Sequence, residues 1–168
     1  MLATKLRSYS LALLAFAVVA APAWSDELYV NLGPEIRGEG GPVGEETSFP
    51  ALRMASSSAN TPAAGGLKIG TFRITRDVGP ASVLIWRRMA QALPLPNVVI
   101  DLYRRDPAGA LVLIQKVHLG QVVVSSIDQH SEPAASGLRF VEEIALNYAS
   151  IDISSAAGQS GLGLRGVY

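Results

Sequence analysis

Residue types that can perform hydrolytic chemistry gather in the stretch VVVSSIDQH, where Ser125, Ser126, Asp128 and His130 lie close together. Nucleophilic catalysis requires a serine hydroxyl within hydrogen-bond reach of an imidazole that a carboxylate orients. In a strand, however, Ser125 and Ser126 point to opposite faces, and Asp128 follows Ser126 by about 7 Å. The chain also lacks the Gly-x-Ser-x-Gly motif of a nucleophile elbow. We therefore interpret this stretch as a strand that leaves the core, and we predict no catalytic residue.

Other candidate sites have equally ordinary explanations. His118 and His130 are the only histidines, and the chain has no cysteine, so we predict no metal site and no cysteine nucleophile. Glu142 and Glu143 are adjacent in a predicted strand and point to opposite faces, which is unlike a glycosidase pair. The motif GLGLRG over 161–166 fits Gly-x-Gly-x-x-Gly, but no helix can follow it to hold a pyrophosphate. We predict no cofactor.

The N-terminal segment has the pattern of a secretory signal peptide. Lys5 and Arg7 precede the apolar run Leu11–Ala21, and small residues follow. We predict a leader over residues 1–25 with cleavage after Ser25, and cleavage after Ala23 as the second choice. An uncleaved N-terminal anchor is the alternative, although the apolar run is short for a membrane span. The predicted location is therefore exported, in the periplasm or secreted, with membrane contact only through the leader.

Length and composition indicate one packed domain. The chain has 168 residues, of which 49% are hydrophobic and 17% are charged. Lys and Arg together number 14, and so do Asp and Glu, which gives no bulk positive charge to attract nucleic acid. The domain is expected over residues 26–155, followed by a loosely ordered glycine-rich tail at 156–168.

Hydrophobic alternation and turn residues place the elements that would position these side chains. Strands are expected over residues 26–32, 48–58, 67–76, 97–105, 110–128 and 138–154. Loops are expected over residues 33–46, 59–66 and 129–137. Changes in the parity of the apolar residues predict a bulge at Gly70 and another between Tyr148 and Ile151, and Gly120 predicts a bend. The loop at 33–46 is rich in Gly, Pro and Glu and is expected to be exposed and to hold no core residue.

A helix is expected over residues 79–94, because Pro80 suits a first helical turn and Pro94 ends the pattern. Its apolar stripe consists of Val83, Trp86, Met89, Ala90 and Leu93, and its polar side consists of Arg87, Arg88 and Gln91. The arginine doublets at 87–88 and 104–105 are expected on solvated faces or subunit contacts, and Asp101 is expected to be exposed. The fold class is mainly β: a small antiparallel β-barrel or two-sheet sandwich with one flanking α-helix.

The order of several segments resembles the haemolysin-coregulated protein (Hcp) family, the tube proteins of bacterial type VI secretion. The similar segments are ELYVNLGPEIRGEG, FRITRDVGPASVLI, VVIDLYRRDPAG, VVVSSI and EEIALNYASIDI. In that family a strand ending in Val-Ser-Ser precedes a loop, and a strand of the form Glu-x-Val-x-Leu-Asn-Phe/Tyr closes the fold. Here these are Val124-Ser125-Ser126 and the segment from Glu142 to Tyr148.

The resemblance implies a non-catalytic structural protein. It implies hexameric rings that stack into a tube, carry effectors in the lumen, and contact spike and sheath components of type VI secretion. The loop at 33–46 would then contact a neighbouring ring. The alternative is an exported periplasmic binding or adaptor module with the same fold and no tube function, and a third hypothesis is an exported hydrolase using Ser125 or Ser126 with His130.

Overall fold

The computed structural model describes residues 25–42, 47–61, 66–155 and 162–165. Residues 1–24 of the predicted leader and most of the predicted tail lie outside these residues, whereas Ser25, the last residue of the predicted leader, begins the first strand. The elements are β1 Ser25–Asn31, β2 Phe49–Ala51, β3 Arg53–Thr61, β4 Gly66–Asp77, α1 Pro80–Ala90, β5 Leu95–Arg105, β6 Leu111–Ala134, β7 Gly137–Asn147, β8 Ser150–Ser155 and β9 Leu162–Arg165.

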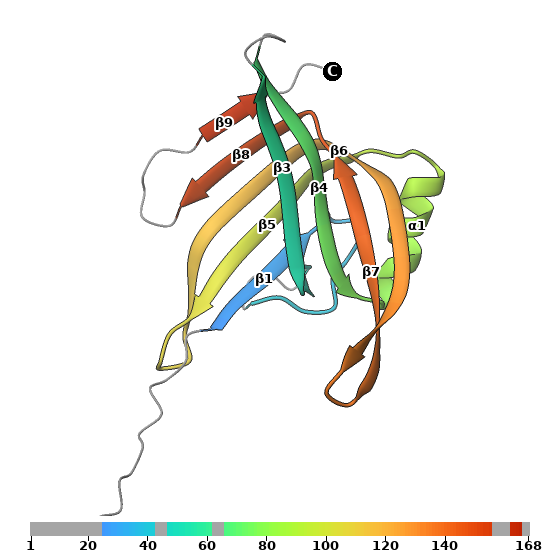
Figure 1. Ribbon diagram of the computed structural model, residues 1–168, viewed down its shortest axis with the longest axis vertical. Coiled ribbons are helices and arrows are strands. Elements are labelled where there is room, and N and C mark those ends of the chain that lie inside the picture. The colour runs from blue at the N-terminus through green and yellow to red at the C-terminus, as the bar shows by residue number, and fades with distance from the viewer. Residues whose placement is uncertain (1–24, 43–46, 62–65, 156–161, 166–168) are drawn as a thin grey trace, which may run out of the picture.

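The strands form two layers joined by β6, with α1 beside β6 and β7 (Figure 1). Hydrogen-bonded neighbours follow the order β2-β1-β5-β6-β7-β4-β3, and β8 pairs with β6 and β9. All of these pairs are antiparallel. The predicted fold class, mainly β with one flanking helix, is confirmed, although the path of strands does not close into a complete barrel.

The core fills the space between the two layers and extends under α1. Its fully buried members come from most elements, because alternate residues of each strand face inward. Removing such an aliphatic side chain from water contributes about 1.5–3 kcal/mol. The core includes Ile36 from the loop between β1 and β2, so the prediction that this loop holds no core residue was wrong.

The long strand β6 bends where it passes from one layer to the other. Its first half pairs with β5 and β8, and its second half, from Val123, pairs with β7. The predicted bend at Gly120 is confirmed by the backbone there: Gln121 has φ 50°, and Gly120 accepts a hydrogen bond from the Ala149 N–H at 3.0 Å. The predicted loop over 129–137 was wrong, because β6 continues to Ala134 and forms a hairpin with β7.

The predicted strand over 138–154 is two strands, and the expected bulge within it is a corner. β7 ends at Asn147 opposite Val123, and β8 begins at Ser150 opposite Gly120. Both strands therefore follow the same edge of β6, on either side of its bend. The apolar residues change parity between Tyr148 and Ile151 because the chain turns this corner between β7 and β8. The tail prediction was wrong in part, because Leu162–Arg165 pairs with β8 as β9.

The bulge predicted at Gly70 is confirmed. Ser56 pairs with Phe72 while Ser58 pairs with Ile69, so β4 carries one more residue than β3 at this point. The second predicted strand is divided into β2 and β3, which pair with β1 and β4 respectively.

The helix is in the expected place but turns a different face to the core. Ala81, Ser82 and Ile85 are buried, whereas Val83 is 65% exposed and Trp86 is 40% exposed. The predicted apolar stripe was therefore wrong for Val83 and Trp86, whereas Met89 of that stripe does pack against the core. Hydrophobic spacing alone could not reveal that the polar Ser82 faces inward, because its hydrogen-bond partner, Glu142, lies on the distant strand β7.

Asp101 is also buried, contrary to expectation. It lies in β5 opposite Lys116 of β6, and the Lys116 Nζ approaches Asp101 Oδ1 at 3.2 Å. The cross-strand cation makes burial of this carboxylate possible.

Candidate assembly surfaces and the Arg76 cluster

The serine, aspartate and histidine that opened the sequence analysis are not brought together. Ser125 lies at a bulge of β6, and its hydroxyl donates a hydrogen bond to the Ala145 carbonyl at 3.1 Å. Ser126, Asp128 and His130 are alternate residues of the same strand. Ser126 and His130 are therefore separated by about 13 Å at their Cα atoms, beyond hydrogen-bond reach.

His130 lines a shallow groove of about 370 Å³ with residues of β3, β4 and β7. These neighbours are Arg53, Met54, Ala55, Arg73, Thr75 and Glu143. In the part of the chain that the structure describes, no group of three His, Cys, Asp or Glu residues is arranged to hold a metal ion.

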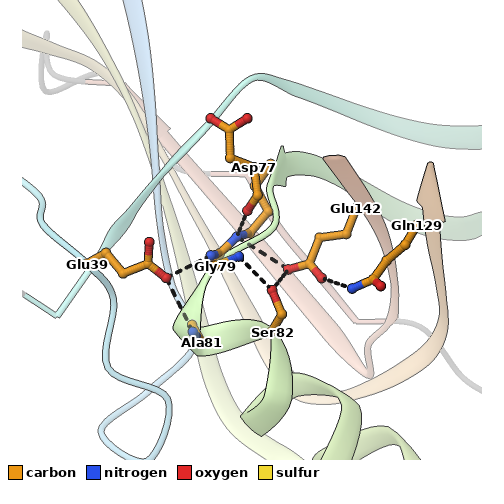
Figure 2. Close-up of polar contacts among 8 residues, drawn as sticks. Glu39, Asp77, Gly79, Ala81, Ser82, Gln129 and Glu142 are labelled. Carbon is orange, nitrogen blue, oxygen red and sulfur yellow. Dashed lines mark hydrogen bonds and ion pairs between the residues drawn. The ribbon is translucent and has the colours of Figure 1, made fainter. Parts of the chain in front are cut away.

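Several buried charged and polar groups form a cluster around Arg76, next to the first turn of α1; Figure 2 labels Glu39, Ser82, Gln129 and Glu142 of this cluster. The side chain of Arg76 is 2% exposed, and that of Glu142, opposite it on β7, is 0% exposed. Arg76 Nε donates to the Asp77 carbonyl at 2.8 Å and lies 3.4 Å from Glu142 Oε1. The Arg76 guanidinium also lies 4.3 Å from the ring centre of Phe49. We define these residues with Glu39, Ser82 and Gln129 as the Arg76 cluster.

The carboxylate of Glu142 is in contact with donors from three different elements. Besides Arg76 of β4, it accepts hydrogen bonds from the Ser82 hydroxyl at 2.8 Å and from Gln129 Nε2 at 3.0 Å. Ser82 Oγ in turn accepts the N–H of Gly79 at 3.0 Å, a donor that the start of a helix leaves without an intrahelical partner. The cluster therefore joins α1 to β4, β6 and β7. Charged residues in a strand suggest a solvated face, so the sequence carried no signal for it.

The loop between β1 and β2 is attached to this cluster. Glu39 Oε1 accepts hydrogen bonds from Arg76 Nη2 at 3.1 Å and from the Ala81 N–H at 3.3 Å (Figure 2). Farther along α1, Glu35 of the loop forms an ion pair with Arg88. The loop therefore runs beside the helix and contacts both of its ends.

The second arginine doublet pairs within the chain. Arg104 Nε donates to Asp26 Oδ1 at 2.8 Å, and Arg105 Nε donates to Glu27 Oε1 at 2.7 Å. The hydrogen bond from Arg104 lowers the pKa of Asp26, and the reciprocal bond raises the pKa of Arg104. Tyr29 donates to Glu27 Oε2 at 2.8 Å; burial, and then this bond, raise the pKa of Tyr29 above its ordinary value.

Large apolar side chains are exposed at several places on the surface, including the hairpin of β6 and β7 and the outer face of α1. The hairpin of β6 and β7 extends past the other strands (Figure 1), and there Leu138 is 71% exposed and Phe140 is 67% exposed. The outer face of α1 carries Val83 and Trp86. Single exposed apolar side chains are common on protein surfaces, whereas contiguous apolar patches mark surfaces that bind other macromolecules.

At the corner of β6 there is a groove of about 710 Å³. It is lined by Pro94, Pro96, Gln121, Val123, Asn147 and Ala149. These side chains include no ionisable group. Within the described residues, no helix has the length and apolar character needed to cross a membrane.

Two β-layers, with a buried cluster of charges that connects one helix and one loop to them, define a mainly β protein with a single flanking helix. The sequence profile of the family described as "Type VI secretion system effector, Hcp" matches residues 46–154. Because this match covers more than half of the chain, the chain belongs to the Hcp family. Among curated proteins, no sequence matches it.

Solved Hcp structures share the fold. Hcp1 from Salmonella typhimurium superposes with a TM-score of 0.68 at 9% identity, covering 82% of this chain and 91% of that chain. The secreted protein Hcp3 from Pseudomonas aeruginosa superposes with a TM-score of 0.66 at 15% identity, covering 87% of this chain and 100% of that chain. A double variant of Hcp1 from E. coli EAEC 042 gives a TM-score of 0.66 at 16% identity, covering 83% and 97%.

Proposed function

We propose that the protein is a non-catalytic structural component of type VI secretion that forms hexameric rings. In this proposal the rings stack into a tube, carry effectors in the lumen and contact spike and sheath components. The observation that carries the proposal is the family match over residues 46–154. The exposed Leu138 and Phe140 of the projecting hairpin support it, because a surface of this kind gains stability when a second copy covers it.

Ring formation requires a head-to-tail contact in which two different surfaces of each copy meet and the rotation closes. Light scattering after chromatography of the purified protein tests the proposal. We expect a mass of six subunits, and a monomer at high concentration would contradict it.

The contribution of the hairpin can be tested in the same experiment. We expect the double substitution Leu138→Ser and Phe140→Ser to reduce the hexamer fraction, because it removes apolar area that a neighbour would cover. Val112→Ser is the matched control, since Val112 is exposed on β6 outside the hairpin. Equal hexamer fractions in all three proteins would exclude the hairpin from the contact.

We also propose that residues 1–25 are a cleaved leader and that the mature domain is exported, with Ala23 as the second cleavage position. This leader favours a second candidate function, a periplasmic binding or adaptor module without tube function. The groove at the β6 corner could accept an apolar ligand. Cell fractionation with N-terminal sequencing tests export, and affinity capture from periplasm should recover a stoichiometric partner if the adaptor function is correct.

A further inference from the structure

The carboxylate of Glu39 lies in a niche that other parts of the chain provide. Its Oε1 accepts hydrogen bonds from Arg76 Nη2 of β4 at 3.1 Å and from the Ala81 N–H in the first turn of α1 at 3.3 Å (Figure 2). Gly79 forms the adjoining wall, because a Cβ added there would lie 2.4 Å from Oε1 and 2.6 Å from Oε2. The carboxylate therefore takes the place of the side chain that position 79 lacks.

The donors of this niche are held in place without Glu39. The first N–H groups of a helix have no intrahelical partner and lie at its positive end, so they attract anions. The side chain of Arg76 is 2% exposed, and its Nε donates to the Asp77 carbonyl at 2.8 Å and lies 3.4 Å from Glu142 Oε1. We therefore expect the niche to keep its shape and its donors when another carboxylate replaces that of Glu39.

Arg76 also has a donor that Glu39 does not use. Within the described residues, Nη1 is buried and has no hydrogen-bond partner, and both hydrogen bonds to Glu39 end on Oε1. A buried donor without a partner costs free energy. A carboxylate that is not attached to the chain can turn to place one oxygen at each end nitrogen of the guanidinium, in the bidentate geometry typical of arginine.

The charges around the niche allow one carboxylate to replace another. Arg76 faces two carboxylates, Glu142 from β7 and Glu39, so exchange of the second for an external monocarboxylate leaves the net charge of the cluster unchanged. Asp77, the next acid along the chain, pairs with Arg139 at 3.0 Å. The side chain of Glu39 is 41% exposed and that of Glu142 is 0% exposed, so solvent reaches only the former.

We propose that Arg76, Gly79 and the Ala81 N–H form a binding site for a small monocarboxylate, which Glu39 fills from within the chain and from which an external carboxylate displaces it. Displacement frees one of the contacts that hold residues 35–39 along α1. The site lies within one subunit, so this inference does not depend on ring formation.

Thermal unfolding of Glu39→Ala in sodium acetate at pH 7 tests the site, with sodium chloride of equal ionic strength as the reference. We expect a saturable rise of about 3–6 °C in the unfolding midpoint at ten times the dissociation constant of acetate, and no such rise in chloride. Glu132→Ala is the matched control, because it removes a carboxylate that pairs with Arg53 instead of Arg76. The absence of a saturable rise in Glu39→Ala would overturn the site.

Gly79→Ala blocks the niche without removing Glu39. The backbone at Gly79 is extended, with φ −153°, so alanine fits that conformation while its methyl group fills the space of the carboxylate. The double variant Glu39→Ala/Gly79→Ala should therefore lose the response to acetate. An equal response in the double variant and in Glu39→Ala would place the bound acetate elsewhere and overturn the assignment.

The wild-type protein tests displacement and does not require any variant to fold. We expect acetate to shift the Ala81 amide resonance and to speed hydrogen exchange of the Gly38 N–H, which donates to the Thr47 carbonyl at 2.8 Å. Half-saturation should lie at least about tenfold higher than in Glu39→Ala, because the attached carboxylate competes at high effective concentration. An Ala81 resonance that does not respond at a hundred times the acetate that saturates Glu39→Ala would overturn displacement.

Discussion

At the scale of single residues, the buried pair of Arg76 and Glu142 has a different environment from its neighbours on the same two strands. Arg73 and Glu143 also form an ion pair between β4 and β7, but both side chains are substantially exposed. Within the described residues, Nη1 of Arg76 has no hydrogen-bond partner, so Arg76 depends on its remaining contacts. We therefore expect the same residue types on the same strands to contribute unequally to stability.

We expect Arg76→Ala to lower the free energy of unfolding by about 3–5 kcal/mol, because it leaves Glu142 buried without its cation. Arg73→Ala, the matched control, should lower it by less than about 1 kcal/mol. Urea unfolding of the two variants provides the comparison. Equal losses would show that burial of the Arg76 cluster does not determine its contribution.

This difference also explains what the sequence could not predict. The alternation along 67–76 and 138–147 placed the two strands, but Arg76 and Glu142 have the residue types of a solvated face. Their burial follows from the arrival of α1 and the β1–β2 loop over the end of the sheet. The sequence placed His130 in a loop beyond the strand, whereas the structure places Ser126 and His130 on one extended strand, too far apart for a hydrogen bond.

The pKa of Tyr29 gives a prediction at alkaline pH. Burial and the hydrogen bond to Glu27 raise it above the ordinary value of 10.0, so the folded protein holds the phenolic proton more tightly than the unfolded chain does. Stability from this group is therefore fully present below pH 10 and is lost as pH rises through the folded pKa. The tyrosinate absorbance of wild type minus that of Tyr29→Phe should titrate above pH 10. Glu27→Gln should move this titration partly back, and a midpoint at or below 10 would contradict the assignment.

At the scale of elements, the fold depends on the corner that β6 shares with β7 and β8. A Cβ at Gly120 would lie 2.4 Å from Ser150 Oγ, the point at which β8 begins beside β6. We expect Gly120→Val to destabilise the protein by about 1–3 kcal/mol through overpacking, measured by thermal or urea unfolding.

Ser150→Ala should restore part of that loss, because it removes the hydroxyl that the new side chain would meet. No restoration in the double variant would place the strain elsewhere in the corner. The sequence predicted a bend at Gly120 from a glycine in a long apolar run. It could not show that β7 and β8 turn with β6, because that arrangement depends on pairing between distant strands.

At the scale of the whole molecule, fold class and family were predictable because they depend on many segments in a fixed order. Strand alternation, turn residues and one helix give a mainly β architecture, and the profile match over residues 46–154 confirms the family. The surfaces were less predictable. Val83 and Trp86, which the sequence assigned to the core-facing stripe of the helix, are exposed. The segment predicted as a loop at 129–137 belongs to a hairpin on which Leu138 and Phe140 are exposed.

The central claim is that these outward surfaces join copies of the protein into a closed ring. Electron microscopy of the purified protein tests it most directly, because projection images report both symmetry and a central opening. We expect ring-shaped particles with sixfold symmetry and an open centre. Particles the size of one subunit would contradict the account, and so would compact oligomers without a central opening. The sample should be imaged at a protein concentration at which light scattering can also be measured.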